Sequence, residues 1–216
     1  MPGKKKAQRK ASVVRSKRNS PKAEGGPDGL PVLELAGAQP WQRWLTRNHG
    51  ASRGVWLAFA KKDSGRTSIT YPEAVEAALC WGWIDGQAHK RDASSWLQRF
   101  SPRGARSVWS KINRDKALSL IERGAMQPPG LAEVERAKRD GRWERAYDSP
   151  RNAQVPDDFK AALAAEPRAA QFFETLNAAN RYAIWFRLHH AKRPETRARR
   201  IAQFVAMLAR GKKLHS

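Results

Sequence analysis

Asp85 stands in a stretch rich in aromatic and basic residues, 80–113, whose only other acidic residue is Asp92 in a predicted turn. Two tryptophans lie close before Asp85, and a run of lysines and arginines follows it. A carboxylate placed among aromatic side chains needs hydrogen-bond donors, because burial of the charge without them is costly. The guanidinium of Arg103 and the indole of Trp109 are such donors. We therefore favour Asp85 as a structural anchor that ties the 102–111 loop to a sheet, with an acid–base role as the alternative.

The neighbours of Asp85 depend on a predicted hairpin of two strands, residues 83–90 and 95–101, joined by the four residues 91–94. One face of the first strand carries Trp83, Asp85, Gln87 and His89. A connection of three or five residues would place Leu97, Arg99 and Ser101 beside Asp85. A connection of two or four residues would place Trp96, Gln98 and Phe100 there instead. The connection has no glycine, which favours the four-residue form.

No second carboxylate stands near Asp85 at a strand spacing, so catalysis by paired carboxylates is not indicated. Asp85 is therefore only a candidate catalytic residue. An enzyme that acts on a small anionic substrate near Asp85, Arg99, Arg103 and Trp109 remains the alternative to a binding protein. The candidate ligand-binding residues are Trp83, Asp85, Arg99, Arg103, Trp109, Lys111 and Asn113.

The remaining chemistry-bearing residues indicate no metal site and no cofactor. His189 and His190 are adjacent, so on a helix they point about 100° apart and make a poor pair of metal ligands. Cys80, the only cysteine, is interpreted as a small core residue, and it excludes an intramolecular disulfide. Three arginines with i, i+4, i+7 helical spacing form a candidate anion patch on the last predicted helix: Arg193, Arg197 and Arg200.

The charge of the chain points to polyanionic partners. The 216 residues carry a formal net charge of +22. Residues 1–22 contain nine lysines or arginines and no acidic residue, a composition that predicts a disordered tail able to attract nucleic acid without sequence preference. No transmembrane segment or secretory signal is predicted, and we expect a cytoplasmic protein. No oligomeric state is predicted.

The elements that must position these residues predict an α+β fold. A strand at 54–62 that is apolar on both faces is expected to lie inside the sheet. The predicted architecture is a small antiparallel sheet packed with helices, followed by an all-helical C-terminal part. We divide the chain into a disordered basic tail and linker at 1–30, an α+β domain at 31–148 and a helical C-terminal module at 149–216.

Several blocks of sequence resemble the YdeI/OmpD-associated family, whose name links it to bacteriocin protection. These blocks are "YPEAVEAALCWGWIDG", "WLQRFSPR", "SVWSKIN", "AKRDGRW" and the tail "AKRPETRARRIAQFVAMLARGKK". The family pattern has a GWID core, an RF(S/T)PR block and a W-S-x-x-N block, which stand here at 82–85, 99–103 and 109–113. The likeness covers roughly 41–213, and the long basic tail departs from it.

This resemblance implies a fold and an association with stress or antimicrobial-peptide tolerance, and it implies no established reaction. We therefore expect a non-enzymatic binding protein linked to bacteriocin or antimicrobial-peptide tolerance. Its expected partners are nucleic acid, through the tail, and a small anionic ligand.

Overall fold

The computed structural model describes residues 25–215. The predicted disordered tail, residues 1–22, lies outside the described residues. The end of the predicted linker is folded against the sheet, because the Asp28 carboxylate accepts hydrogen bonds from the Trp56 indole at 2.6 Å and from Arg99 Nε at 3.0 Å.

A four-stranded sheet forms the centre of the N-terminal part, in the order β1 (Val32–Glu34), β2 (Val55–Ala60), β4 (Ser95–Pro102) and β3 (Trp83–Lys90). β2 lies inside the sheet, as its two apolar faces predict. β2, β4 and β3 pair antiparallel, whereas the edge strand β1 pairs parallel with β2. The predicted α+β fold class is confirmed, and β1 is a strand that the sequence pattern did not indicate.

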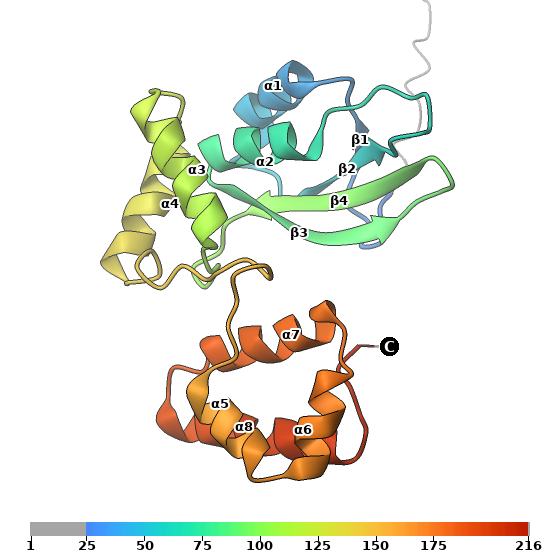
Figure 1. Ribbon diagram of the computed structural model, residues 1–216. Helices are drawn as coiled ribbons and strands as arrows, with labels where there is room; N and C mark the ends of the chain where they lie inside the picture. The colour runs from blue at the N-terminus through green and yellow to red at the C-terminus, as the bar shows by residue number, and fades with distance from the viewer. Residues whose placement is uncertain (1–24, 216) are drawn as a thin grey trace, which may run out of the picture.

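Helices α1 (Ala38–Asn48) and α2 (Tyr71–Cys80) lie across one face of this sheet (Figure 1). Between them and the strands is a core built around Trp41, Trp83 and Phe100, each at most 1% exposed. The Trp41 and Trp83 rings meet edge to face at 6.2 Å. The predicted ligand-binding residue Trp83 is thus a core residue, and its indole N–H donates to the His49 carbonyl.

Local signals in the sequence position the helix that faces Asp85. Thr70 and Glu73 form the predicted capping box, which pairs two free backbone N–H groups at the start of α2. Gly82 ends the turn after α2 with φ +72°, a conformation that favours glycine. The helix that follows the hairpin, α3 (Lys111–Glu122), is capped by the Ser110 hydroxyl.

α4 (Pro128–Arg139) belongs to the sheet-containing part, and the four helices after it surround a second core. They are α5 (Asp157–Ala164), α6 (Pro167–Glu174), α7 (Ala178–His189) and α8 (Pro194–Ala209). α3 and α4 both pack against α2 beside the sheet, whereas α5 to α8 lie together below it (Figure 1). Phe159, Phe173 and Ile184 are central to the second core. None of the helices in residues 25–215 is long and apolar enough to cross a membrane.

Candidate functional site around Asp85

Asp85 lies on the helix-covered face of the sheet, opposite Phe100 of β4. The connection between β3 and β4 has the predicted four residues, and Phe100 is one of the neighbours that this connection favours. Two residues further on, the register changes, since Ala88 pairs with Gln98. β3 therefore has one extra residue, a β-bulge at Gly86 and Gln87, directly after Asp85.

The bulge separates Asp85 from His89. His89 pairs with Leu97, and its ring contacts Trp56 at 6.3 Å on the opposite face of the sheet. The prediction that Asp85 and His89 share a face is wrong, because one extra residue reverses the alternation of side chains. The buried Gln98 amide donates to the Gly86 carbonyl at 2.8 Å, so it pairs a backbone oxygen of the bulge.

The hydrogen-bond partner of Asp85 is Tyr71, the first residue of α2. The Tyr71 hydroxyl donates to Asp85 Oδ2 at 2.6 Å. Burial, and then the bond to the Asp85 carboxylate, raise the pKa of Tyr71 well above its ordinary value of 10. Tyr71 is therefore a stable O–H donor near neutral pH, and it connects the start of α2 to β3.

Asp85 lines a hollow of about 710 Å³ that we call the tyrosine hollow. All three tyrosines of the chain line it: Tyr71, Tyr147 and Tyr182. Asp85 and Lys116 are its only lining residues with charged side chains, and Ser110 and Asn113 add polar groups. A hollow of this volume with apolar walls and a few polar groups is typical of a small-molecule site.

Tyr147 lies in the wall of the hollow, in an extended segment that pairs with Ser110. The Tyr147 N–H donates to the Trp109 carbonyl at 2.9 Å, and Lys111 N–H donates to the Tyr147 carbonyl at 2.8 Å. Burial is the main cause that raises the pKa of Tyr147, and the charge of Asp85 adds to it. The charge of Arg103 and a hydrogen bond with Ser110 lower the pKa of Tyr147 in part. Tyr147 is thus a second protonated phenol in the field of Asp85.

The predicted ion pair between Asp85 and Arg103 is absent from the described part of the chain. The Arg103 guanidinium instead stacks on the Trp109 ring at 3.6 Å, and its Nη1 donates to the Val108 carbonyl at 3.3 Å. Arg103 is only 4% exposed, and burial lowers its pKa to about 10, although the charge of Asp85 opposes that change. Its Nε and Nη2, together with Trp109 Nε1, have no hydrogen-bond partner within the described residues 25–215.

The geometry explains why the expected pair does not form. Stacking on a tryptophan face holds the guanidinium plane behind the wall of the hollow, through a cation–π contact that is strong when desolvated. Arg103 therefore acts on Asp85 through its charge and not through a hydrogen bond. The Trp109 indole likewise donates nothing to Asp85, which corrects the prediction of a second donor there.

The other predicted site residues are dispersed. Asn113 lines the tyrosine hollow with Asp85. Arg99 points to the opposite face, where it pairs with Asp28 at 3.0 Å. Lys111 pairs with Asp148 at 2.8 Å and lines a different hollow.

The candidate anion patch on α8 is partly neutralised. Arg197 forms two bonds with the Asp158 carboxylate and a third with the Leu188 carbonyl. Arg200 donates to the Arg187 carbonyl, whereas Arg193 is exposed at the N-cap of the helix. The patch stays a prediction with less free charge than the spacing indicates.

Sequence reasoning missed the three tyrosines. Tyr71 and Tyr147 are separated by 76 positions, and no repeating pattern connects them. Two features of the sequence could have drawn attention to them. Tyrosine is rare in this chain, with three tyrosines against nine tryptophans, and Tyr71 directly follows the capping-box residue Thr70. Among the described residues, no group of three or more histidine, cysteine, aspartate or glutamate side chains is placed to hold a metal ion.

Comparison with protein-family models finds two matches. Residues 33–133 match a domain of unknown function (DUF8412), and this region contains the blocks at 82–85, 99–103 and 109–113. Residues 152–211, which contain α5 to α8, match the family described as bacteriocin-protection, YdeI or OmpD-associated. No curated protein and no solved structure matches the chain. The resemblance indicated by the sequence is thus confirmed for residues 152–211, which are similar to the bacteriocin-protection, YdeI or OmpD-associated family.

Proposed function

We propose that the protein is a non-enzymatic binding protein whose small-molecule site is the tyrosine hollow. One observation carries the proposal: Asp85, held by Tyr71 at 2.6 Å, lines a hollow in which all three tyrosines meet. Asp85 Oδ1 has no hydrogen-bond partner among residues 25–215, so it is available to a ligand. Deprotonated carboxylates only accept hydrogen bonds, so the ligand must donate one.

The chemistry of the hollow selects an aromatic ligand with an amine or hydroxyl group. Flat aromatic walls favour ring stacking, and a carboxylate favours a cationic or donating group. The small anionic ligand expected from the sequence suits this hollow less well, because Asp85 would repel it. Lys116 is the one cation in the lining and can accommodate an acceptor group at another position of the same ligand.

An enzyme at this site remains the second candidate, favoured by the exposure of Asp85 to the hollow. A general base works best with a pKa near the operating pH. The lining contains no histidine, no cysteine and no second carboxylate, and the phenols have raised pKa values. These features support binding over acid–base catalysis.

Binding is tested with matched aromatic probes on the full-length protein. Tyramine, which carries an amine, should raise the melting temperature, whereas 4-hydroxyphenylacetate, which carries a carboxylate, should not. Asp85→Asn should remove the effect of tyramine. Asp63→Asn removes a carboxylate from an exposed turn and is the matched control. Equal stabilisation by the acid and the amine would contradict the proposal, as would a response that Asp85→Asn leaves unchanged.

We place this binding activity in bacteriocin or antimicrobial-peptide tolerance, supported by the description of the family that residues 152–211 match. A cytoplasmic location stays a proposal from the sequence alone. The net charge of +22 opposes direct capture of a cationic peptide. A small ligand is the more compatible partner. Loss of the gene should sensitise cells to such peptides, and the wild-type gene should restore tolerance, whereas an Asp85→Asn gene should not.

The basic tail adds a proposed attraction to nucleic acid, supported by the nine positive charges in residues 1–22. Removal of residues 1–22 should weaken DNA binding and reduce its salt dependence. Nine phosphate contacts would correspond to a slope of up to about −8 in log K against log salt, and fewer contacts give a smaller slope. An unchanged slope after removal of the tail would contradict this proposal.

A further inference from the structure

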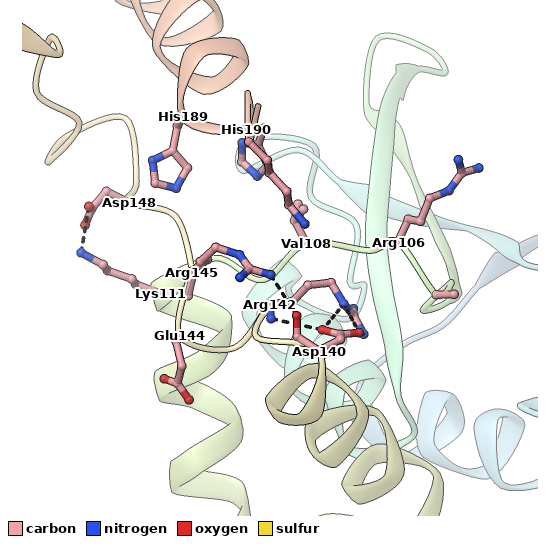
Figure 2. Close-up of a pocket in the computed structure, with 13 residues that line it drawn as sticks. Arg106, Val108, Lys111, Asp140, Arg142, Glu144, Arg145, Asp148, His189 and His190 are labelled. Carbon is pink, nitrogen blue, oxygen red and sulfur yellow. Dashed lines mark hydrogen bonds and ion pairs between the residues drawn. The ribbon is translucent and has the colours of Figure 1, made fainter. Parts of the chain in front are cut away.

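A second hollow, separate from the tyrosine hollow, lies between the sheet-containing part and the end of α7 (Figure 2). We call it the histidine hollow and define it by Arg142, Arg145, His189, His190 and Lys192. Its volume is about 610 Å³, within the range of small-molecule sites. The hollow is lined by three stretches of the chain that are remote in sequence, so it exists only in the folded protein.

Two of the cations in this hollow are already neutralised. Arg142 is buried and forms an ion pair with Asp140 at 2.8 Å, and its Nη1 donates to the Ser107 carbonyl. Lys111 pairs with Asp148 at 2.8 Å. These pairs stabilise the walls, and they also occupy two of the three carboxylates that line the hollow.

Three other lining cations, Arg106, Arg145 and Lys192, form no ion pair with a carboxylate among residues 25–215. Arg106 points away from Arg142 and Arg145 in Figure 2. Arg145 Nη2 donates to the Asp140 backbone carbonyl at 2.9 Å, which positions its guanidinium but does not neutralise it. Lys192 is exposed and has no bond or ion pair within the described part of the chain. The third carboxylate of the lining, Glu144, points away from Arg142 and Arg145 in Figure 2. The hollow therefore has an excess of positive charge.

The rest of the lining is apolar or aromatic. The His189 ring stacks on Trp185 with centroids 4.8 Å apart, and burial, followed by the nearby His190, lowers the pKa of His189. A histidine that stays neutral at pH 7 provides a flat surface for a ring system. Val108 and Ala146 complete the apolar wall. Free cations beside a flat apolar surface match a ligand with a phosphate at one end and an organic body at the other.

We infer that the histidine hollow binds a small phosphorylated organic molecule, with Arg145 and Lys192 as the phosphate-binding residues. Arginine suits a phosphate because its planar fork can donate two parallel hydrogen bonds. This site differs from the tyrosine hollow in its residues and in the charge of its ligand. It also gives the small anionic ligand expected from the sequence a site in which, of the predicted ligand-binding residues, only Lys111 takes part.

The test is calorimetric titration of the full-length protein with adenosine 5′-monophosphate at physiological salt. Adenosine and inorganic phosphate are titrated in parallel, because they separate the contribution of the organic body from that of the phosphate. The variants are Arg145→Gln and Lys192→Gln. Lys192 is exposed and forms no hydrogen bond or ion pair among residues 25–215, so Lys192→Gln reports on the site even if Arg145→Gln disturbs the fold. Arg199→Gln removes one exposed charge that does not line the hollow and is the control.

We expect saturable binding of the monophosphate, and weaker binding of adenosine and of inorganic phosphate. Each of the two hollow variants should raise the dissociation constant about tenfold, which is a loss of about 1.4 kcal/mol in binding free energy. The Arg199→Gln protein should bind like the wild type. Equal losses in all three variants would show attraction by net charge alone and overturn the inference. Absence of saturable binding, or adenosine bound as tightly as its monophosphate, would overturn it too.

Discussion

The hydrogen bond between Tyr71 and Asp85 is the contact that joins α2 to β3 at the tyrosine hollow, and its contribution can be measured. The perturbations are Tyr71→Phe, which removes only the hydroxyl, Asp85→Ala, and the double variant. The cycle of the three isolates the coupling free energy between the two side chains. Asp63→Ala, in an exposed turn, controls for the loss of one negative charge.

The expected magnitude follows from burial. A hydrogen bond to a charged group contributes about 1.5–3 kcal/mol to stability. Tyr71 is 38% exposed, so water can replace part of the bond when either partner is removed. We therefore expect a coupling free energy of about 1 kcal/mol. Asp85→Ala should cost about 1–2 kcal/mol in total, since Arg103 makes no hydrogen bond to Asp85 that could be lost.

Urea denaturation of the four proteins measures these values from the shift of the midpoint at constant slope. A coupling free energy near zero would refute the hydrogen bond as a stabilising contact in solution. A loss of about 3–5 kcal/mol in Asp85→Ala is the size expected when one partner of a buried ion pair is removed. That result would show that Asp85 and Arg103 act as a pair, contrary to the geometry described above.

Three further predictions concern packing and protonation. Gly130→Ala should lower the melting temperature, because the added Cβ would overlap the Cys80 carbonyl. This loss is expected although alanine is favoured over glycine in a helix by about 1 kcal/mol. A raised melting temperature would contradict the close approach. In a pH titration, tyrosinate absorbance should appear at a higher pH in the folded protein than in the urea-unfolded control, because burial raises the pKa of Tyr182 to about 12 and that of Tyr71 further. The free energy of unfolding should therefore fall as the pH rises above about 10, the pKa of tyrosine in the unfolded chain. Hydrogen bonds from the Ser95 hydroxyl and the Ser94 N–H lower the pKa of the Asp92 carboxylate. Asp92 should therefore stabilise the hairpin above about pH 4 and lose that effect as the pH falls through its pKa in the folded protein. The melting temperatures of wild type and Asp92→Asn should converge in acid, and a constant difference would refute the assignment.

The local elements of this fold were predictable because their signals lie within a few residues. The capping box of Thr70 and Glu73 marks the start of α2, and Gly82 marks the turn after it, since each depends on hydrogen bonds or φ angles of adjacent residues. The four-residue connection at 91–94 was likewise predicted from the lack of glycine. Asp85 was identified as notable because an acidic residue is rare in its surroundings, which is a property of composition alone.

Tertiary structure alone decided what Asp85 contacts. One extra residue in β3 moved His89 to the opposite face. Gly86 is compatible with a bulge, but a glycine in a strand does not by itself fix where the register changes. The approach of Tyr71 depends on how α2 packs across the sheet, and Tyr147 reaches the same hollow through a pairing with Ser110 formed only in the folded chain. Arg103 had two partners of suitable chemistry, a carboxylate and an indole ring. In the folded chain the Arg103 guanidinium lies 3.6 Å from the Trp109 ring centroid, and no ion pair joins it to Asp85 within residues 25–215.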